Sequence, residues 1–391
     1  MIIPPHLAHL PPPSPEAQAL SDQLSGLIAA ELDQARGTIS FTRYMELALY
    51  APGLGYYSAG SRKLGEAGDF VTAPELSPLF TRCIARQLAQ LHGVGLPSVL
   101  ELGAGSGALA ADLLLALDML GCAPTHYQIL ELSADLRERQ ETTLAERAPA
   151  LKERVRWLNK LPDAFEGVMI ANEVLDATPA HVITLQQGEL REALVQRSRQ
   201  GDACTWHEGA APEAVTQAVN QLDLPGHDYT TEINLSARAL VESLARALTR
   251  GVMLFIDYGF PAREFYHPQR NRGTLMCHYR HHAHDDPFAM IGLQDITTHV
   301  DFSAMATAAI AGGATLLGYA TQAQFLINCG ITDLLSATPA SDARNYAPLA
   351  AQAQKLLSPA EMGELFKVIT FGKGVSAPLL GYARGDKSHT L

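Results

Sequence analysis

One stretch of the chain limits its possible folds more than any other. Val99 to Leu102 has the apolar character of a short buried strand, interrupted by one acid, Glu101. Glycines then occupy every second position, at Gly103, Gly105 and Gly107, before an Ala- and Leu-rich helical pattern. A strand, a glycine turn and a helix in this order are typical of α/β sheets that bind nucleotide-like ligands. Glycine lets the chain turn sharply and lets a ligand approach the backbone.

This glycine loop is by itself compatible with two ligands. Its spacing, Gly103-x-Gly105-x-x-Ala108, also fits the fingerprint of folds that bind nicotinamide dinucleotides. Glu101 favours S-adenosyl-L-methionine, because a carboxylate is unfavourable beside a pyrophosphate and favourable beside an ammonium and a sulfonium. A dinucleotide-dependent oxidoreductase stays as the alternative.

The second strand of the expected sheet, residues 126–131, ends in an acid. A carboxylate at this position, Glu131, accepts hydrogen bonds from the hydroxyls of a ribose, which either cofactor carries. Ser133 has the character of the N-cap of the next helix. Glu131 therefore predicts adenosine binding without choosing the cofactor.

The fourth expected strand, residues 167–171, is apolar throughout, as strands buried on both faces are. Three polar side chains follow it, those of Asn172, Glu173 and Asp176. Because ligands bind beyond the carboxyl ends of parallel strands, we expect these side chains to face the same crevice as the glycine loop.

The composition of the chain limits the classes of partner and the cellular compartment that we expect. The chain has 391 residues, of which 47% are hydrophobic and 18% charged, as in an ordinary globular protein. Its net charge of −12 disfavours nucleic acid as a partner. The five scattered cysteines form no C-x-x-C pair, which favours a reducing compartment over a disulfide framework or a cysteine zinc site.

Targeting signals are not evident. No Lys or Arg precedes Arg36, so the N-terminus lacks the basic residues of a signal or transit peptide. The longest weakly polar run, near residues 304–320, is too mixed to cross a bilayer. We expect a cytoplasmic protein that does not insert into membranes.

A segment rich in Arg and His covers residues 263–286. It shows no H-E-x-x-H pattern. We therefore expect a polar, partly ordered loop there and no metal site.

Domain organisation follows from the same patterns. Apolar residues at helical spacing predict a helix from Glu16 to Arg36, and alternation predicts a hairpin over residues 181–196. The expected regions are an N-terminal arm (1–15), a helical and collar region (16–97), a main domain (98–375) with insertions at about 181–235, 260–300 and 321–364, and a tail (376–391).

Several blocks match one known family. They are residues 68–77 (GDFVTAPELS), 101–107 (ELGAGSG), 171–177 (ANEVLDA), 231–234 (TEIN), 272–275 (RGTL) and 321–326 (TQAQFL). In these blocks the chain resembles the MidA-like S-adenosyl-L-methionine-dependent methyltransferases, which include a mitochondrial complex I assembly factor that methylates arginine.

The resemblance implies an α/β fold. It is the Rossmann-like sheet of class I methyltransferases, mostly parallel with an antiparallel last strand and helices on both faces. An N-terminal helical unit and inserted β and helical segments are added to it. The implied cofactor is S-adenosyl-L-methionine, with S-adenosyl-L-homocysteine as product. The implied acceptor is an arginine side chain of a protein, of the type of a respiratory complex I subunit.

Resemblance and position together assign the site. The glycines would admit the cofactor, with Glu101 near its amino group and Glu131 at its ribose. Thr72 and Glu75, in the collar formed by residues 68–77, would close over it. The residues assigned to the cofactor are Glu101, Gly103, Gly105, Gly107, Glu131, Ser133, Asn172, Thr72 and Glu75.

Glu173 and Asp176 are the catalytic candidates, because carboxylates can orient a guanidinium that is always charged. Asp176 could instead cap a turn before Pro179. A non-catalytic assembly factor that keeps the fold is a further alternative. The sequence leaves the identity of the acceptor and the oligomeric state open.

Overall fold

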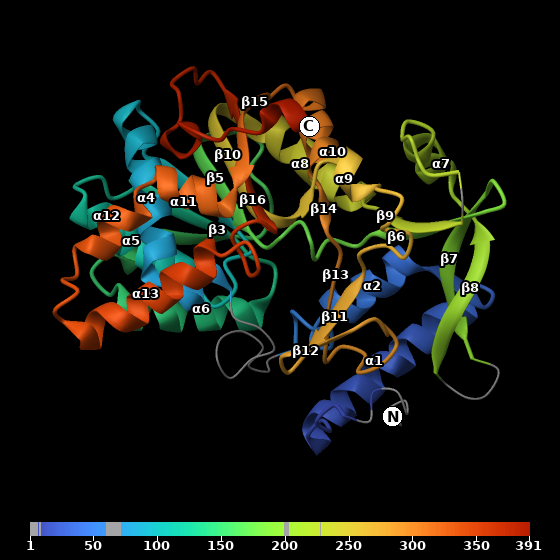
Figure 1. Ribbon diagram of the computed structural model, residues 1–391. Coiled ribbons are helices and arrows are strands. Elements are labelled where there is room, and N and C mark those ends of the chain that lie inside the picture. Colours follow the sequence, from blue (N-terminus) through green and yellow to red (C-terminus); the bar gives the residue numbers. More distant parts are fainter. Residues whose placement is uncertain (1–6, 8, 60–71, 199–202, 227) are drawn as a thin grey trace. The chain divides into compact units, whose positions relative to one another are not determined.

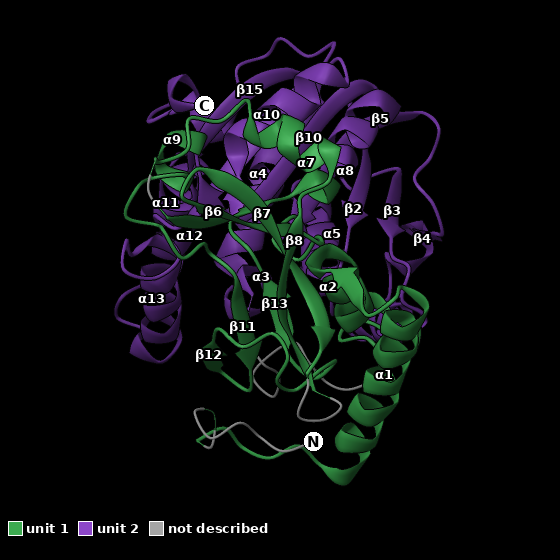
Figure 2. Cartoon of the chain, turned by 90° about the vertical axis from the view of Figure 1, so that its right-hand side faces the viewer, with its two compact units in different colours: residues 1–70, 175–238, 262–299 green, residues 71–174, 239–261, 300–391 purple. Residues whose placement is uncertain are grey.

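The computed structural model describes residues 7, 9–59, 72–198, 203–226 and 228–391 (Figure 1). The chain forms two units, coloured green and purple in Figure 2. Unit 1 comprises Met1–Phe70, Leu175–Arg238 and Ala262–His299, and unit 2 comprises Val71–Val174, Ala239–Pro261 and Val300–Leu391.

A mostly parallel sheet forms the centre of unit 2. Its strand order is β15-β16-β10-β5-β2-β3-β4, and β14 pairs with β10 beside this path. Strands β10, β5, β2, β3 and β4 pair in parallel, whereas β16, last in the chain, is antiparallel to both of its neighbours. The strands are β2 (Ser98–Leu102), β3 (His126–Leu130), β4 (Val155–Leu158), β5 (Phe165–Asn172), β10 (Leu248–Phe260), β14 (Val300–Asp301), β15 (Thr315–Thr321) and β16 (Phe366–Lys373). The predicted α/β sheet with an antiparallel last strand is confirmed.

Several helices of unit 2 begin at polar side chains that cap them. Ser77 and Ser133 accept hydrogen bonds from the first turns of α4 and α6, and Asp301 does the same for α10. The helices are α3 (Ala73–Leu76), α4 (Pro78–Gly93), α5 (Ala108–Met119), α6 (Ala134–Arg147), α10 (Phe302–Ala311), α11 (Gln322–Asn328), α12 (Ile331–Ser336) and α13 (Ala343–Leu357).

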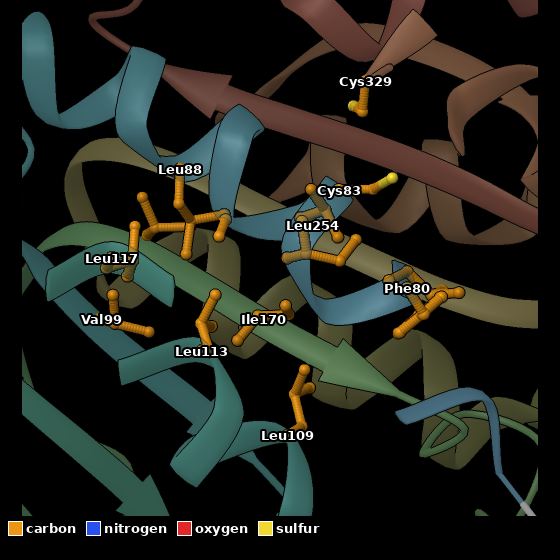
Figure 3. Close-up of a cluster of buried hydrophobic side chains, with 14 of the residues drawn as sticks. Phe80, Cys83, Leu88, Val99, Leu109, Leu113, Leu117, Ile170, Leu254 and Cys329 are labelled. Atoms are coloured by element: carbon orange, nitrogen blue, oxygen red, sulfur yellow. The ribbon is translucent and has the colours of Figure 1, made fainter. Parts of the chain in front are cut away.

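Apolar packing buries both faces of this sheet. Val252 and Leu254 of β10 contribute to a core cluster with α4 and α5, part of which is drawn in Figure 3. Met253 and Phe255, which alternate with them, are also buried. A strand that is apolar on both faces is what a parallel sheet covered by helices requires.

Unit 1 contains two antiparallel sheets. The first has the order β1-β7-β6-β9 with β8 beside β7, and the second has the order β12-β11-β13. Helices α1 and α2 share an apolar core with strands of both sheets. The strands are β1 (Thr38–Ser40), β6 (His181–Gln186), β7 (Glu189–Arg197), β8 (Cys204–Ala210), β9 (Tyr229–Ile233), β11 (Met276–Tyr279), β12 (His282–His284) and β13 (Asp295–Thr297). The helices are α1 (Pro15–Gln34), α2 (Phe41–Tyr50), α7 (Glu213–Val219) and α9 (Ala262–Phe265), and α8 (Leu235–Ala247) begins in unit 1 and ends in unit 2.

The division into units differs from the expected regions. The N-terminal residues and the segments expected as insertions at 181–235 and 260–300 group together in unit 1. Strand pairing is the cause, because Ile39 of β1 lies opposite Val195 of β7. The three-residue β1 carries too little pattern to reveal such a distant partner.

The described residues bear on two expectations, the loop over residues 263–286 and the membrane-spanning character of the helices. The Arg- and His-rich segment is only partly a loop, because β11 and β12 form a hairpin in which Cys277 lies opposite His284. Its polar side chains concealed the strand pattern. No described helix combines the length and the apolar character needed to cross a membrane.

Gly167 and Gly251 let the first parts of β5 and β10 lie close together. A Cβ on Gly251 would lie 1.9 Å from the carbonyl oxygen of Gly167, and Gly251 has a φ of +142°. Gly251→Ala must therefore separate the two strands or distort the backbone. We expect a loss of about 3 kcal/mol or more in the free energy of unfolding, measured by urea denaturation.

The matched control is Gly93→Ala, at the end of α4. No atom lies within 4 Å of a Cβ placed on Gly93. The free energy of unfolding should stay equal or rise by about 0.5 kcal/mol. Equal stabilities for the two variants would contradict the role given to Gly251.

Candidate functional site

Three strands of unit 2 end at one edge of the sheet. Leu102, the last residue of β2, lies opposite Ala171 of β5 and Leu130 of β3. The backbone N–H of Gly103 donates to the Leu130 carbonyl at 3.2 Å. Gly103 and Asn172 therefore leave the sheet side by side, as the sequence predicted for a common crevice.

All three glycines of the loop adopt left-handed φ angles. They are +61° at Gly103, +53° at Gly105 and +82° at Gly107, a region that disfavours residues with a Cβ. A Cβ on Gly103 would lie 3.1 Å from the side chain of Val174, and one on Gly107 would lie 3.0 Å from Cα of Gln140. Gly107 thus permits the close approach of α6 and also forms the N-cap of α5.

Glu131 lies just beyond β3 and is only 7% exposed. Its Oε1 accepts from the backbone N–H of Ser133 at 2.9 Å, and its Oε2 accepts from Nε2 of Gln140 at 3.1 Å. Burial raises the pKa of this carboxyl, and these hydrogen bonds act in the opposite direction. Ser133 caps α6 through Leu136, which confirms its predicted place at the helix start.

Arg137 holds the carboxyl end of β3 through its guanidinium. Its Nε donates to the Glu131 carbonyl at 2.7 Å, and its Nη2 donates to the Leu158 carbonyl at 2.6 Å. A guanidinium that spans two strand ends fixes the backbone from which the Glu131 carboxylate projects.

Leu132, which the sequence analysis did not select, is 79% exposed. A large apolar side chain left in water next to a buried carboxylate suits a flat apolar ligand surface beside a polar one. In the sequence, the only indication of a role for Leu132 was its position between Glu131 and Ser133. Most leucines are buried, so its exposure could not be predicted.

Glu101 is only 2% exposed, and its Oε2 accepts from the hydroxyl of Tyr127 at 2.6 Å. Burial raises the pKa of this carboxyl to about 7, although the Tyr127 hydrogen bond lowers it. The acid that precedes the glycine loop is therefore held inside unit 2, one residue before the end of β2.

The turn after β5 is held by its neighbour β10. Glu173 has a φ of +52°, unusual for a residue with a long side chain. Its N–H donates to the Ile256 carbonyl at 2.9 Å, and Asp257 Oδ2 accepts from the Val174 N–H at 3.2 Å. Nδ2 of Asn172 donates to Oε1 of Glu173 at 2.9 Å. Asp257 of β10 therefore takes part in fixing this turn.

Two of the buried acceptors in unit 2 that lack a hydrogen-bond donor among the described residues belong to predicted cofactor residues. They are Oδ1 of Asn172 and Oε2 of Glu75, on α3. A ligand with ammonium, hydroxyl or amine hydrogens can satisfy them, so the residues present fit S-adenosyl-L-methionine. Thr72 precedes α3 without capping it through its side chain. The collar residues Gly68–Val71 lie outside the described part of the chain.

The two catalytic candidates fall in different units, because the boundary runs between Val174 and Leu175. Asp176 belongs to unit 1 and is 5% exposed. Its carbonyl accepts from the Thr298 N–H at 3.0 Å. Their joint action stays a prediction.

Among the described residues, no group of three or more His, Cys, Asp or Glu side chains is arranged to hold a metal ion. The histidines of β11 and β12 thus form no such cluster.

Comparison with known proteins identifies the chemistry. The model of a family described as "Putative S-adenosyl-L-methionine-dependent methyltransferase" matches residues 81–320, which include the glycine loop, Glu131 and Glu173. The chain belongs to this family. The predicted resemblance and the predicted cofactor are confirmed, and the methyltransferase prediction prevails over the dinucleotide-dependent alternative.

Two solved structures resemble nearly the whole chain. A Burkholderia thailandensis protein crystallised with bound S-adenosyl-homocysteine is 50% identical, with a TM-score of 0.94 over 98% of this chain and 100% of that one. A native crystal structure from the same organism is also 50% identical, with a TM-score of 0.92 and the same coverage.

Curated relatives are more distant. The mitochondrial protein arginine methyltransferase NDUFAF7 of Mus musculus is 30% identical over 372 residues, which cover 85% of this chain and 80% of the relative. The protein of the same name from Danio rerio is 29% identical over 364 residues, with coverage of 85% and 83%.

The raised pKa of Glu101 predicts how stability depends on pH. Between the ordinary pKa of 4.5 and about 7, the folded protein holds a proton at Glu101 that the unfolded chain has lost. Stability from this group is therefore present below pH 4.5 and is lost as pH rises through 7. Relative to Glu101→Gln, the wild type should lose about 3 kcal/mol over this range, measured by denaturant unfolding. Parallel pH profiles for the two proteins would contradict the assignment.

Proposed function

We propose that this methyltransferase modifies an arginine side chain of a protein. The curated relatives that align with 85% of the chain are named protein arginine methyltransferases, which supports the acceptor. The observation that carries the proposal is the carboxylate of Glu173, which accepts from Asn172 just after β5, the strand that pairs with β2.

The acceptor sets a clear chemical demand. When bound, S-adenosyl-L-methionine supplies a methyl group that passes from its sulfonium to a guanidinium nitrogen, as the carbon–sulfur bond breaks and the nitrogen loses a proton. The chain must hold the planar guanidinium so that one nitrogen faces the methyl group. It must also keep the positive charge on the other nitrogens, which a carboxylate beside them favours.

Glu173 is suited to this orienting role. Its left-handed backbone costs roughly 1–2 kcal/mol, and β10 holds it in place through the Ile256 carbonyl and Asp257. Strain of this kind persists where the surrounding structure imposes it, and it is common at active sites. Asn172 further restricts the orientation of the Glu173 carboxylate by donating a hydrogen bond to Oε1. Asp176 stays a candidate for a second catalytic carboxylate, as predicted from the sequence.

The cofactor contacts are part of the proposal. Glu131 accepts from the ribose hydroxyls, and the loop at Gly103, Gly105 and Gly107 admits the methionyl and ribose portions. Glu101 favours the positive end of the cofactor by its charge, and Ser133 sets the start of α6. Asn172, Thr72 and Glu75 offer further polar contacts.

Glu131→Gln tests the ribose contact. The substitution keeps the shape of the side chain but removes the charge that strengthens hydrogen bonds to hydroxyls. We expect binding of S-adenosyl-homocysteine, measured by titration calorimetry, to weaken roughly 10- to 100-fold. Unchanged affinity would remove Glu131 from the site.

The partner and the location are further parts of the proposal. The acceptor protein is proposed to be of the respiratory complex I subunit type that the family resemblance implied. All five cysteines are free, which supports a reducing compartment such as the cytoplasm. The relatives above are named mitochondrial, so the cytoplasmic location stays a prediction.

Glu173→Gln tests the function. The purified protein is incubated with labelled S-adenosyl-L-methionine and a lysate of cells that lack it, and methylarginine is located by mass spectrometry. The variant should lower methyl transfer about 100-fold, because the guanidinium loses its orienting charge. Affinity for S-adenosyl-homocysteine should stay within a few-fold.

Glu166→Gln is the matched control. Glu166 lies at the opposite end of β5, where its exposed carboxylate pairs with Arg250 at 2.8 Å. An exposed pair of this kind contributes little, so turnover should not change. Normal turnover in Glu173→Gln would reject its role, and cofactor binding without any methylarginine in the wild type would favour the non-catalytic assembly factor.

A further inference from the structure

The side-chain amide of Gln140, on α6, connects three parts of unit 2. It is 0% exposed. Its Nε2 donates to the Gly105 carbonyl at 3.1 Å and to Oε2 of Glu131 at 3.1 Å. Its Oε1 accepts from Nε1 of Trp157, at the end of β4, at 2.8 Å.

This arrangement permits one orientation of the amide. The indole nitrogen of Trp157 can only donate, so it must face the amide oxygen. Glu131 and the Gly105 carbonyl can only accept, so they must face the two amide hydrogens. A flipped amide would place like groups together in all three contacts, at a cost that burial increases.

Gln140 thereby fixes two groups that face the ligand. One is the carboxylate of Glu131, whose other oxygen is held by the Ser133 N–H at 2.9 Å. The other is the peptide at Gly105, the middle of the glycine loop. Each oxygen of Glu131 retains acceptor capacity for a hydroxyl. A carboxylate that is oriented before the ligand arrives loses less freedom on binding.

Helix packing brings Gln140 to this position. Gly107 has no side chain, and a Cβ there would lie 3.0 Å from Cα of Gln140. The third glycine of the loop therefore lets α6 approach close enough for the amide to reach Gly105.

We propose that Gln140 is the positioning residue of the cofactor site and that Trp157 sets the orientation of its amide. Gln140 holds Glu131 and the glycine loop in the geometry that receives the ribose. This inference rests on the proposed contact between Glu131 and the ribose hydroxyls.

The test compares two ligands by titration calorimetry. They are S-adenosyl-homocysteine and its analogue without the ribose 2′ and 3′ hydroxyls. Wild type should prefer the first ligand. Gln140→Met, which keeps the length but makes no hydrogen bond, should lose about 10-fold of this preference. A general packing defect would weaken both ligands equally and leave the preference intact, which would overturn the proposal.

Two further variants keep the test independent of folding defects in Gln140→Met. Gln140→Glu places a second carboxylate beside Glu131, so the preference for S-adenosyl-homocysteine over the analogue should fall at pH 8. The preference should partly recover toward pH 6, because the new carboxyl is then protonated and donates a hydrogen bond to Glu131. A preference that does not vary with pH contradicts the proposal. Trp157→Phe removes the N–H that orients the amide and should lose a smaller part of the preference.

Glu141→Met is the matched control, since Glu141 is the next residue of α6 and is exposed. It should leave the preference unchanged. The same measurement on Glu131→Gln distinguishes the ribose contact of Glu131 from the positioning role of Gln140. Full preference in Glu131→Gln would reject the ribose contact itself, whereas loss there with full preference in Gln140→Met would reject only the role of Gln140.

Discussion

The parallel pairing of β2 with β5 is the constraint on which the site of unit 2 depends. Leu102 lies opposite Ala171, so both strands end together and release Gly103 and Asn172 at one edge. Both faces of the sheet are covered, so a slip by one residue would turn every side chain of a strand to the wrong face. The apolar pattern of β5 thus fixes where Glu173 emerges.

Backbone N–H groups hold buried carboxylates in both units. Glu131 and Asp257 show this in unit 2. In unit 1, Glu232 accepts from the N–H groups of Thr274 at 2.9 Å and Leu275 at 3.0 Å. This contact joins the TEIN and RGTL blocks of the sequence. A carboxylate held by amides keeps its charge available for a ligand, whereas an ion pair would neutralise it.

The main sheet was predictable because its signals are local. Apolar strands, glycines and a serine N-cap identified β2, β5 and the start of α6, and the position after a parallel strand placed Asn172 and Glu173 at the ligand edge. The sharing of one core by residues 24–57 and the segments around β7 and β11 was not predictable, because β1 pairs with a partner more than 150 positions away along the chain. The role of Gln140 was not predictable, because one polar residue on an otherwise ordinary helix carries no periodic signal.

The sequence by itself determined the class of sheet, the glycine loop and the acids that follow the strands, since these depend on the conformations that neighbouring residues allow. Only the tertiary structure decided that Glu101 is buried against Tyr127, that Glu173 adopts a left-handed backbone, and that Gln140 links Glu131 to Gly105. Burial and hydrogen bonding between distant residues set these properties. They arise only when β3, β4, α6 and β10 pack around the loop, which no local pattern can specify.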